Sequence, residues 1–270
     1  MAKKMPAIPL VFWIVCGTVI PLLVVLYYGF TDRTGKFTID NILAIRESVH
    51  LQALGLSLLL SVISTLICLV LAFPLAMVLK SSSLGRRGFI IFIFILPMWM
   101  NFLLRTMAWQ VILEKGGIFN SMLAALHLPQ LNIINTPAAI VLGMVYDYLP
   151  FMVLPIYNVL LKIDDDLINA AYDLGATNRV VFRSVILPLS VPGIASGITM
   201  VFVPSLTTFV ISNILGGGKI YLIGNIIEQE FTTSANWNLG SGISIVMMIF
   251  IVIGMTALTK LDAGEEAAFL

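Results

Sequence analysis

The sequence contains few charged residues, few cysteines and few histidines. Asp, Glu, Lys and Arg together make up 11% of its 270 residues, whereas an ordinary soluble domain carries about 25%. The formal net charge of +1 provides no long-range attraction for nucleic acid or acidic lipid. Cys16, Cys68, His50 and His127 stand far apart, so neither a disulfide framework nor a metal centre is expected. These shortages argue against a soluble enzyme, a disordered protein and a nucleic-acid binder.

Hydrophobic residues, in contrast, make up 59% of the chain, and the mean hydropathy is +1.03. A helix needs about 20 apolar residues to cross the hydrocarbon core of a bilayer, and its backbone groups must be paired inside the lipid. Six runs are long enough, with Arg105 and Asp147 as the only charged residues inside them. We therefore expect an all-α integral membrane protein with six transmembrane helices in a single domain over residues 1–270. The expected spans are residues 8–30, 51–79, 88–113, 137–161, 189–211 and 240–259.

The distribution of basic residues predicts the orientation of these spans. The first run lacks the small-residue cleavage site of a signal peptide, so it is expected to be retained, and six spans place both termini on one side. That side holds nine Lys and Arg residues and the other side holds five, so the positive-inside rule assigns both termini to the cytoplasm. We expect a multi-pass protein of the cell membrane. Its outward loops are residues 31–50, 114–136 and 212–239, and its inward loops are 80–87 and 162–188.

The inward loop 162–188 is too long for a simple connection, and its pattern predicts two short helices. Asp164–Asp166 can cap the first helix, and Gly175 stops it because glycine accepts a positive φ. The second helix starts near Thr177 and ends at Pro188. Such a segment either packs on the membrane domain or lies in a groove of a partner protein, and the residues alone leave both possibilities open. The apolar stripes are Leu167, Ala170, Ala171 and Leu174 in the first helix, and Phe182, Val185 and Ile186 in the second.

The same loop resembles the EAA loop of ABC importer permeases. It reads Asn169-Ala170-Ala171, then Gly175, Val185 and Leu187-Pro188 in register, with Asn169 in place of the usual Glu and Val185 in place of the usual Ile. The resemblance implies a type I ABC importer permease fold and a coupling helix that docks on a cytoplasmic ATPase. The residues implied for this docking are Leu167, Asn169, Ala170, Ala171, Asp173, Leu174, Gly175, Ala176, Phe182, Val185, Leu187 and Pro188.

Further motifs resemble the first of the two permeases in spermidine/putrescine importers. They are residues 96–99 with 104–109, residues 148–157, and residues 215–225. The resemblance implies a polyamine substrate, a second permease subunit, a cytoplasmic ABC ATPase homodimer and an extracytoplasmic solute-binding protein. ATP and Mg are then bound by the ATPase, and this chain carries no cofactor. Importers of other small organic solutes share much of this pattern, so a different solute is the alternative.

A route for polyamines needs carboxylates or carbonyls for the ammonium groups and aromatic faces for cation–π contact. Asp147 is the first candidate, because an ionisable residue inside a span is costly and usually functional. A structural ion pair with Arg105 is the competing explanation, and both hold if the pair opens when substrate arrives. The candidate pathway residues are Asp147, Tyr146, Tyr148, Trp99, Arg105 and Trp109, although Trp and Tyr are common at membrane interfaces without such a role.

Glu228, Glu230 and Trp237 are candidates for contact with a cationic solute or a binding protein at the outer face, and a solvated loop is the competing explanation. Residues 216–219 resemble a phosphate-binding loop only loosely, and no H-E-x-x-H or G-x-S-x-G motif is present. We therefore expect a transport subunit, not an enzyme, with ATP hydrolysis on a partner. An ion-coupled secondary transporter that uses Asp147, and an intramembrane enzyme, are the alternatives from other classes.

Overall fold

The computed structural model describes residues 8–82 and 96–266, and its regular elements in these two ranges are helices. The first range contains α1 (Ile8–Ile14), η2 (Val15–Val19), α2 (Ile20–Gly29), α3 (Asp40–Leu43), η3 (Ala44–Arg46) and α4 (Ser48–Ser81). The second contains η4 (Leu96–Trp99), α7 (Phe102–Leu113), α8 (Ile118–Ala125), α9 (Pro137–Leu160), α10 (Asp165–Asp173), α11 (Asn178–Val181), η5 (Phe182–Ile186), α12 (Leu187–Leu189), α13 (Val191–Thr207), α14 (Val210–Leu215), α15 (Ile223–Thr232) and α16 (Trp237–Glu266).

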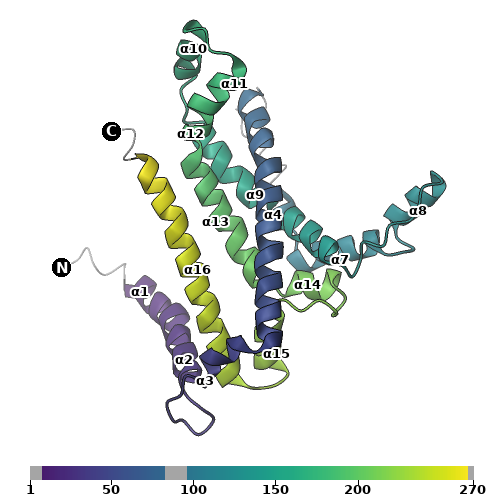
Figure 1. The fold of residues 1–270 in the computed structure, drawn as a ribbon, viewed down its shortest axis with the longest axis vertical. Helices are drawn as coiled ribbons and strands as arrows, with labels where there is room; N and C mark the ends of the chain where they lie inside the picture. The colour runs from purple at the N-terminus through teal and green to yellow at the C-terminus, as the bar shows by residue number, and fades with distance from the viewer. Residues whose placement is uncertain (1–7, 83–95, 267–270) are drawn as a thin grey trace.

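Three long helices, α4, α9 and α13, form the centre of the bundle (Figure 1). Small residues on α13 allow it to approach α9 closely. A Cβ added at Gly193 would stand 3.0 Å from the carbonyl oxygen of Pro155, and one added at Gly197 would stand 2.6 Å from Met152 Sδ. Inside lipid, helices associate largely through such close van der Waals contact, because lipid tails are as apolar as leucine. The large side chains that are fully buried here include Ile140, Met144, Met152, Ile156 and Tyr157.

A glycine contact also holds α16 against α3, and it leads to a stability prediction. A Cβ added at Gly242 would stand 2.5 Å from the carbonyl carbon and oxygen of Asn41, and backbone atoms cannot rotate away. We expect Gly242→Ala to destabilise the protein by about 1–3 kcal/mol, measured as a lower Tm of the detergent-purified chain. Gly254→Ala on the same helix is the matched control, since no described atom lies within 4 Å of its added Cβ. Equal Tm values for Gly242→Ala and the wild type would contradict the close contact.

Four helical segments of the described chain are long and apolar enough to cross a membrane: Val11–Gly29, Ser48–Ser81, Pro137–Leu160 and Trp237–Thr256. Two further segments, Asn178–Leu189 and Val191–Thr207, meet at an angle of 62° and make a fifth crossing if they form one broken span. These segments overlap five of the six runs expected from the sequence. The total number of crossings stays a prediction.

The third expected span, residues 88–113, is broken within its described part, and its residues 88–95 lie outside the described residues. The short 3-10 helix η4 ends at Trp99, and α7 starts afresh at Phe102. The side chain of Asn101 accepts hydrogen bonds from the backbone N–H groups of Leu103 and Leu104, at 2.9 and 3.3 Å. This cap satisfies the first free donors of a new helix, so the continuous helix suggested by the apolar run does not form.

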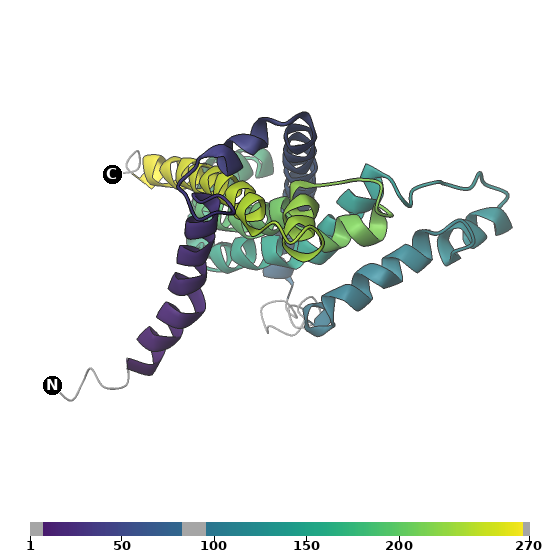
Figure 2. The same cartoon turned by 90° about the horizontal axis from the view of Figure 1, so that it is seen from below.

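Three segments expected as loops contain helices instead, and the first of them, residues 31–50, includes α3 and η3. Residues 114–136 include α8, and residues 212–239 include most of α14 and all of α15. The placement of Glu228 and Glu230 in a loop is therefore wrong, because both lie on α15. Figures 1 and 2 show that α7 and α8 extend away from the bundle on one side, while α1 and α2 extend from it elsewhere. Much of the apolar surface of these extensions is exposed on the isolated chain.

The two ends of the bundle carry different elements. Helices α10 and α11 lie at one end, near the C-terminal end of α16, whereas α3 and α15 lie at the other (Figure 1). Beside α3, Asp32 accepts hydrogen bonds from the Thr34 hydroxyl and from the backbone N–H groups of Thr34 and Lys36, at 2.7 to 2.9 Å. These bonds, that of the Thr34 hydroxyl first, hold the pKa of Asp32 below its ordinary value. Because α10 carries part of the coupling motif and α15 carries the two candidate glutamates, these features lie at opposite ends of the bundle.

Candidate functional site

The segment with the coupling motif forms an exposed arm, defined here as residues 165–181. Asp164 caps α10 by accepting a hydrogen bond from the backbone N–H of Asp166 at 3.0 Å, and Gly175 ends the turn with a φ of +83°. Both features agree with the pattern of the sequence. Thr177 occupies the N-cap position of α11, where the second helix was expected to start, and its side chain makes no capping hydrogen bond to the described residues.

The arm presents its first apolar stripe to the outside. Leu174 is 90% exposed and Leu167 is 54% exposed, while Asn169, Ala170 and Asp173 are also exposed. Exposed leucines on a short amphipathic helix are typical of a segment that docks into a groove of a partner. Among the other residues of the motif, Ala171, Ala176, Val185 and Pro188 are half-buried, and Leu187 is exposed.

The second stripe packs on the bundle and anchors the arm. The ring of Phe182 makes an edge contact with Phe73 of α4, with centroids 5.6 Å apart. Lys80, near the end of α4, donates to the carbonyl oxygen of Ile163 at 3.0 Å and lies 3.4 Å from the carboxylate of Asp165. Of the two possibilities left open by the sequence, packing on the membrane domain is therefore seen for the second half of the segment, whereas the first half is exposed. The expected second helix over 177–188 is in fact three pieces, α11, the π-helical turn η5 and α12.

A second group lies deep in the bundle, where α7 meets α9. Arg105 and Asp147 form an ion pair with 3.3 Å between Nη2 and Oδ1, and their side chains are only 8% and 1% exposed. Thr106 donates to the other carboxylate oxygen of Asp147 at 3.3 Å. Among the described residues, Arg105 Nε and Asp147 Oδ1 have no hydrogen-bond partner. The hydrogen bonding of the ion pair is therefore incomplete. A buried pair of this kind is sensitive to the loss of either member.

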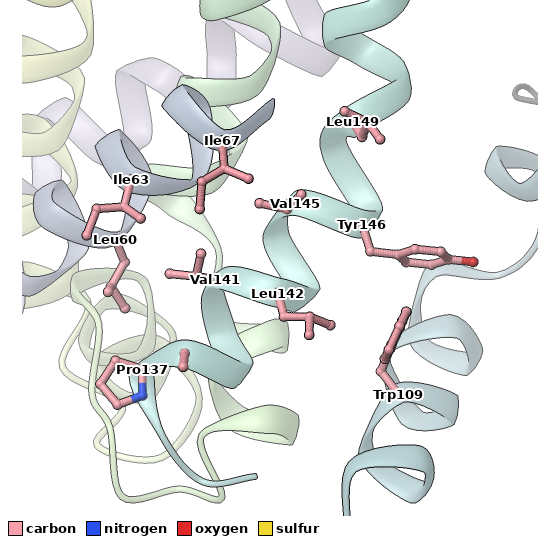
Figure 3. Close-up of a pocket in the computed structure, with 11 residues that line it drawn as sticks. Leu60, Ile63, Ile67, Trp109, Pro137, Val141, Leu142, Val145, Tyr146 and Leu149 are labelled. Atoms are coloured by element: carbon pink, nitrogen blue, oxygen red, sulfur yellow. The ribbon is translucent and has the colours of Figure 1, made fainter. Parts of the chain in front are cut away.

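The structure separates the aromatic pathway candidates from one another. Trp109 and Tyr146 contact each other edge to face at 5.2 Å and line an apolar groove of about 630 Å³ with Leu60 and Ile63 (Figure 3). Tyr148 is buried, and its hydroxyl is 3.5 Å from the carbonyl oxygen of Pro204. Trp99 is 75% exposed on η4. Only Trp109 and Tyr146 thus share one surface.

At the opposite end of the bundle, Trp237 links three elements. Its ring lies 5.5 Å from that of Phe231 on α15 and 6.0 Å from that of Tyr28 on α2. Glu230 accepts a hydrogen bond from Ser234 at 3.3 Å, and Glu228 accepts one from Thr232 at 3.0 Å. The two glutamates and Trp237 are therefore held by an ordered helix and its turn.

The sequence reasoning missed a buried polar cluster around Asn225. Its side-chain oxygen accepts from Ser212 at 2.6 Å and from the backbone N–H of Leu222 at 2.9 Å, and its nitrogen donates to Asn213 at 2.7 Å. Ser57 of α4 accepts from the backbone N–H of Ile223 at 2.8 Å. The cluster satisfies backbone groups of Phe209, Leu222 and Ile223 on either side of α14, because buried N–H and C=O groups need partners. Its signal in the sequence was the unusual polarity of Ser57 and Asn225 among apolar neighbours.

Comparison with known proteins agrees with this architecture. The profile of a family described as binding-protein-dependent transport system inner membrane component matches residues 5–264. The chain is similar to the spermidine/putrescine transport system permease protein PotB of Haemophilus influenzae, with 36% identity over 249 residues, which cover 89% of this chain and 87% of the relative. Identity to the protein of the same name from Escherichia coli is 34% over 266 residues, or 96% of both chains.

Solved structures show the same fold. A bacterial ABC transporter involved in the import of the acidic polysaccharide alginate superimposes with a TM-score of 0.80 at 17% sequence identity, and the alignment covers 94% of this chain and 92% of that one. The all-α ABC importer permease fold expected from the sequence is thereby confirmed. The match over residues 5–264 and the identities to curated relatives show that the chain belongs to the family of binding-protein-dependent transport system inner membrane components, as a multi-pass permease subunit.

Proposed function

We propose that this chain is one of two permease subunits of an ATP-driven importer of polyamines such as spermidine and putrescine. The substrate class rests on relatives that carry this name and match most of the chain. The observation that carries the coupling role is the exposed arm, in which Leu174 is 90% exposed at one end of the bundle. A solute-binding protein docks at the other end of the bundle and delivers the polyamine there.

In this proposal, α10 docks on a cytoplasmic ABC ATPase homodimer, which binds ATP and Mg and carries out the hydrolysis, so this chain is not itself an enzyme. Both termini then lie in the cytoplasm with the arm. The contacts of Phe182 with Phe73 and of Lys80 with Ile163 connect the arm to α4. A displacement of α10 is thereby transmitted to the centre of the bundle.

The polyamine passes between this chain and the second permease. Asp147 exchanges its partner Arg105 for a substrate ammonium group, and Trp99, Trp109, Tyr146 and Tyr148 supply aromatic faces along the route. The incomplete hydrogen bonding of the ion pair supports such an exchange. The route then alternates between states that bind the substrate differently.

Uptake of labelled spermidine and putrescine by proteoliposomes tests this proposal. They contain the chain with its co-expressed permease, ATPase and binding protein. We expect uptake that needs ATP, and a loss of about tenfold or more for Asp147→Asn, because a hydrogen bond to a charged group contributes about 1.5–3 kcal/mol. Glu114→Gln is the matched control, since Glu114 is exposed at the end of α7.

The alternatives give different results in the same assay. ATP hydrolysis stimulated by the binding protein, without polyamine uptake, would retain the importer class and discard the substrate. Uptake without any ATPase subunit would favour an ion-coupled secondary transporter. Wild-type uptake by an assembled Asp147→Asn complex would remove Asp147 from the route.

A further inference from the structure

A separate cavity of about 510 Å³ lies between the end of α13, α15 and α16. Small-molecule sites in proteins span about 300–1,000 Å³ and combine mostly apolar walls with a few polar groups. This cavity has that composition, and α15, which forms one of its walls, lies at the end of the bundle opposite the arm (Figure 1). Its apolar walls include Phe209, Ile227, Phe231, Met247, Met248 and Ile251, and its polar side chains are Thr207, Glu228, Thr232 and Ser244.

Glu228 is the single charged side chain among the residues that line this cavity. The Thr232 hydroxyl lies 3.0 Å from Glu228 Oε1 and 2.8 Å from the backbone carbonyl oxygen of Glu228. The side chain is half-buried, so a cation there is partly shielded from water. A half-buried carboxylate with a hydroxyl beside one of its oxygens is suited to a charge-assisted hydrogen bond from an ammonium group.

The end of α13 adds partial negative charge beside this carboxylate. The helix stops at Thr207, and the chain resumes as α14 at Val210. The carbonyl oxygens of Thr207 and Thr208 approach the cavity wall at Gly224, where an added Cβ would stand 2.6 and 2.7 Å from them. The C-terminal ends of helices favour cations, and broken helices in transporters use them for this purpose.

The aromatic residues complete the chemistry of a cation site. Phe209 and Phe231 both line the cavity, and the face of an aromatic ring attracts an ammonium group. Met247 and Met248 offer flexible apolar surface for a methylene chain. A flexible aliphatic chain with a terminal ammonium group therefore matches both the charged and the apolar parts of this cavity.

We propose that this cavity is a binding site on the permease for one ammonium end of a polyamine, with Glu228 as its anionic contact. The proposal rests on the proposed function and deepens it, because it assigns the substrate a site near the end where the binding protein delivers it. The ammonium group lies between Glu228 and the end of α13. The ring of Phe231 contacts this ammonium group, and the methylene chain lies along Met247 and Met248.

Glu228→Gln tests this site in the assembled proteoliposome system. We expect spermidine uptake to fall by about tenfold or more, because one charge-assisted hydrogen bond is lost. ATP hydrolysis stimulated by the binding protein should stay at the wild-type level, since Glu228 is on α15, and α15 lies at the opposite end of the bundle from α10 and α11 (Figure 1). Glu47→Gln is the matched control, because the Glu47 side chain is 67% exposed at the start of α4 and does not line the cavity.

The outcomes separate this site from the proposed function. Polyamine uptake by the wild type together with unchanged uptake by Glu228→Gln would overturn the site and leave the function intact. Absence of polyamine uptake by the wild type would overturn the function, and the site with it. If Glu228→Gln does not assemble, Phe231→Leu is tested in its place. A several-fold fall in uptake would support the site, because a cation–π contact is worth about 0.5–2 kcal/mol. Unchanged uptake by Phe231→Leu would overturn the site.

Discussion

Leu174→Glu is expected to remove the ATPase subunit from the purified complex. Leu174 is the C-cap residue of α10, is 90% exposed, and precedes Gly175. Burying a leucine side chain against a partner contributes about 1.5–3 kcal/mol, and an unpaired carboxylate in the same groove costs several kcal/mol more. Affinity for the ATPase should therefore fall by about a hundredfold or more. Co-purification of the ATPase with the tagged permease measures this loss.

Two controls distinguish lost docking from lost folding. Leu174→Met keeps an apolar side chain of similar volume, which usually costs less than about 1.5 kcal/mol, so the ATPase should still co-purify. Because Leu174 is so exposed in the isolated chain, the Tm of the permease alone should be the same for Leu174→Glu as for the wild type. Normal ATPase co-purification with Leu174→Glu would exclude α10 as the docking element.

Arg105→Ala is expected to be the most damaging single change to stability. It leaves the carboxylate of Asp147, whose side chain is 1% exposed, without the cation that lies 3.3 Å away. Breaking a buried ion pair by removing one member costs about 3–5 kcal/mol. The expected result is a marked fall in Tm and in the yield of monodisperse protein in detergent. A Tm equal to that of the wild type would contradict the burial of this pair.

The double variant Arg105→Met with Asp147→Leu separates structure from transport. Replacing a buried pair with apolar residues of similar volume is often neutral or stabilising, so most of the lost Tm should return. Restored stability with normal polyamine uptake would make the pair purely structural. Restored stability without uptake would support a place for Asp147 on the route. Thr106 keeps a partner in either case, because its hydroxyl also lies 3.0 Å from the carbonyl oxygen of Phe102.

The long apolar runs predicted the main helices well, and their interruptions poorly. The runs at 51–79 and 137–161 lie in α4 and α9, because lipid requires every backbone group in such a run to be paired. The breaks at Asn101 and at Thr208 have no signal in hydropathy. The first depends on an asparagine side chain turning onto its own backbone, and the second on the distant cluster around Asn225.

The arm shows what local pattern can predict. The cap by Asp164 and the stop at Gly175 depend on neighbouring residues only, and both were predictable for this reason. The direction of each apolar stripe was not, since a stripe alone does not reveal which surface covers it. Contact between Phe182 and Phe73, far apart in the chain, decided that the second stripe packs inward.

The sequence by itself determined the membrane class, the main helices and the coupling motif, because hydropathy and short-range spacing are properties of neighbouring residues. Only the tertiary structure decided which polar groups meet. Arg105 and Asp147 are 42 positions apart yet form a pair at 3.3 Å, and Glu228 shares a cavity with Thr207 and Met247. Such encounters depend on how whole helices pack and where they break, and no local pattern contains that information.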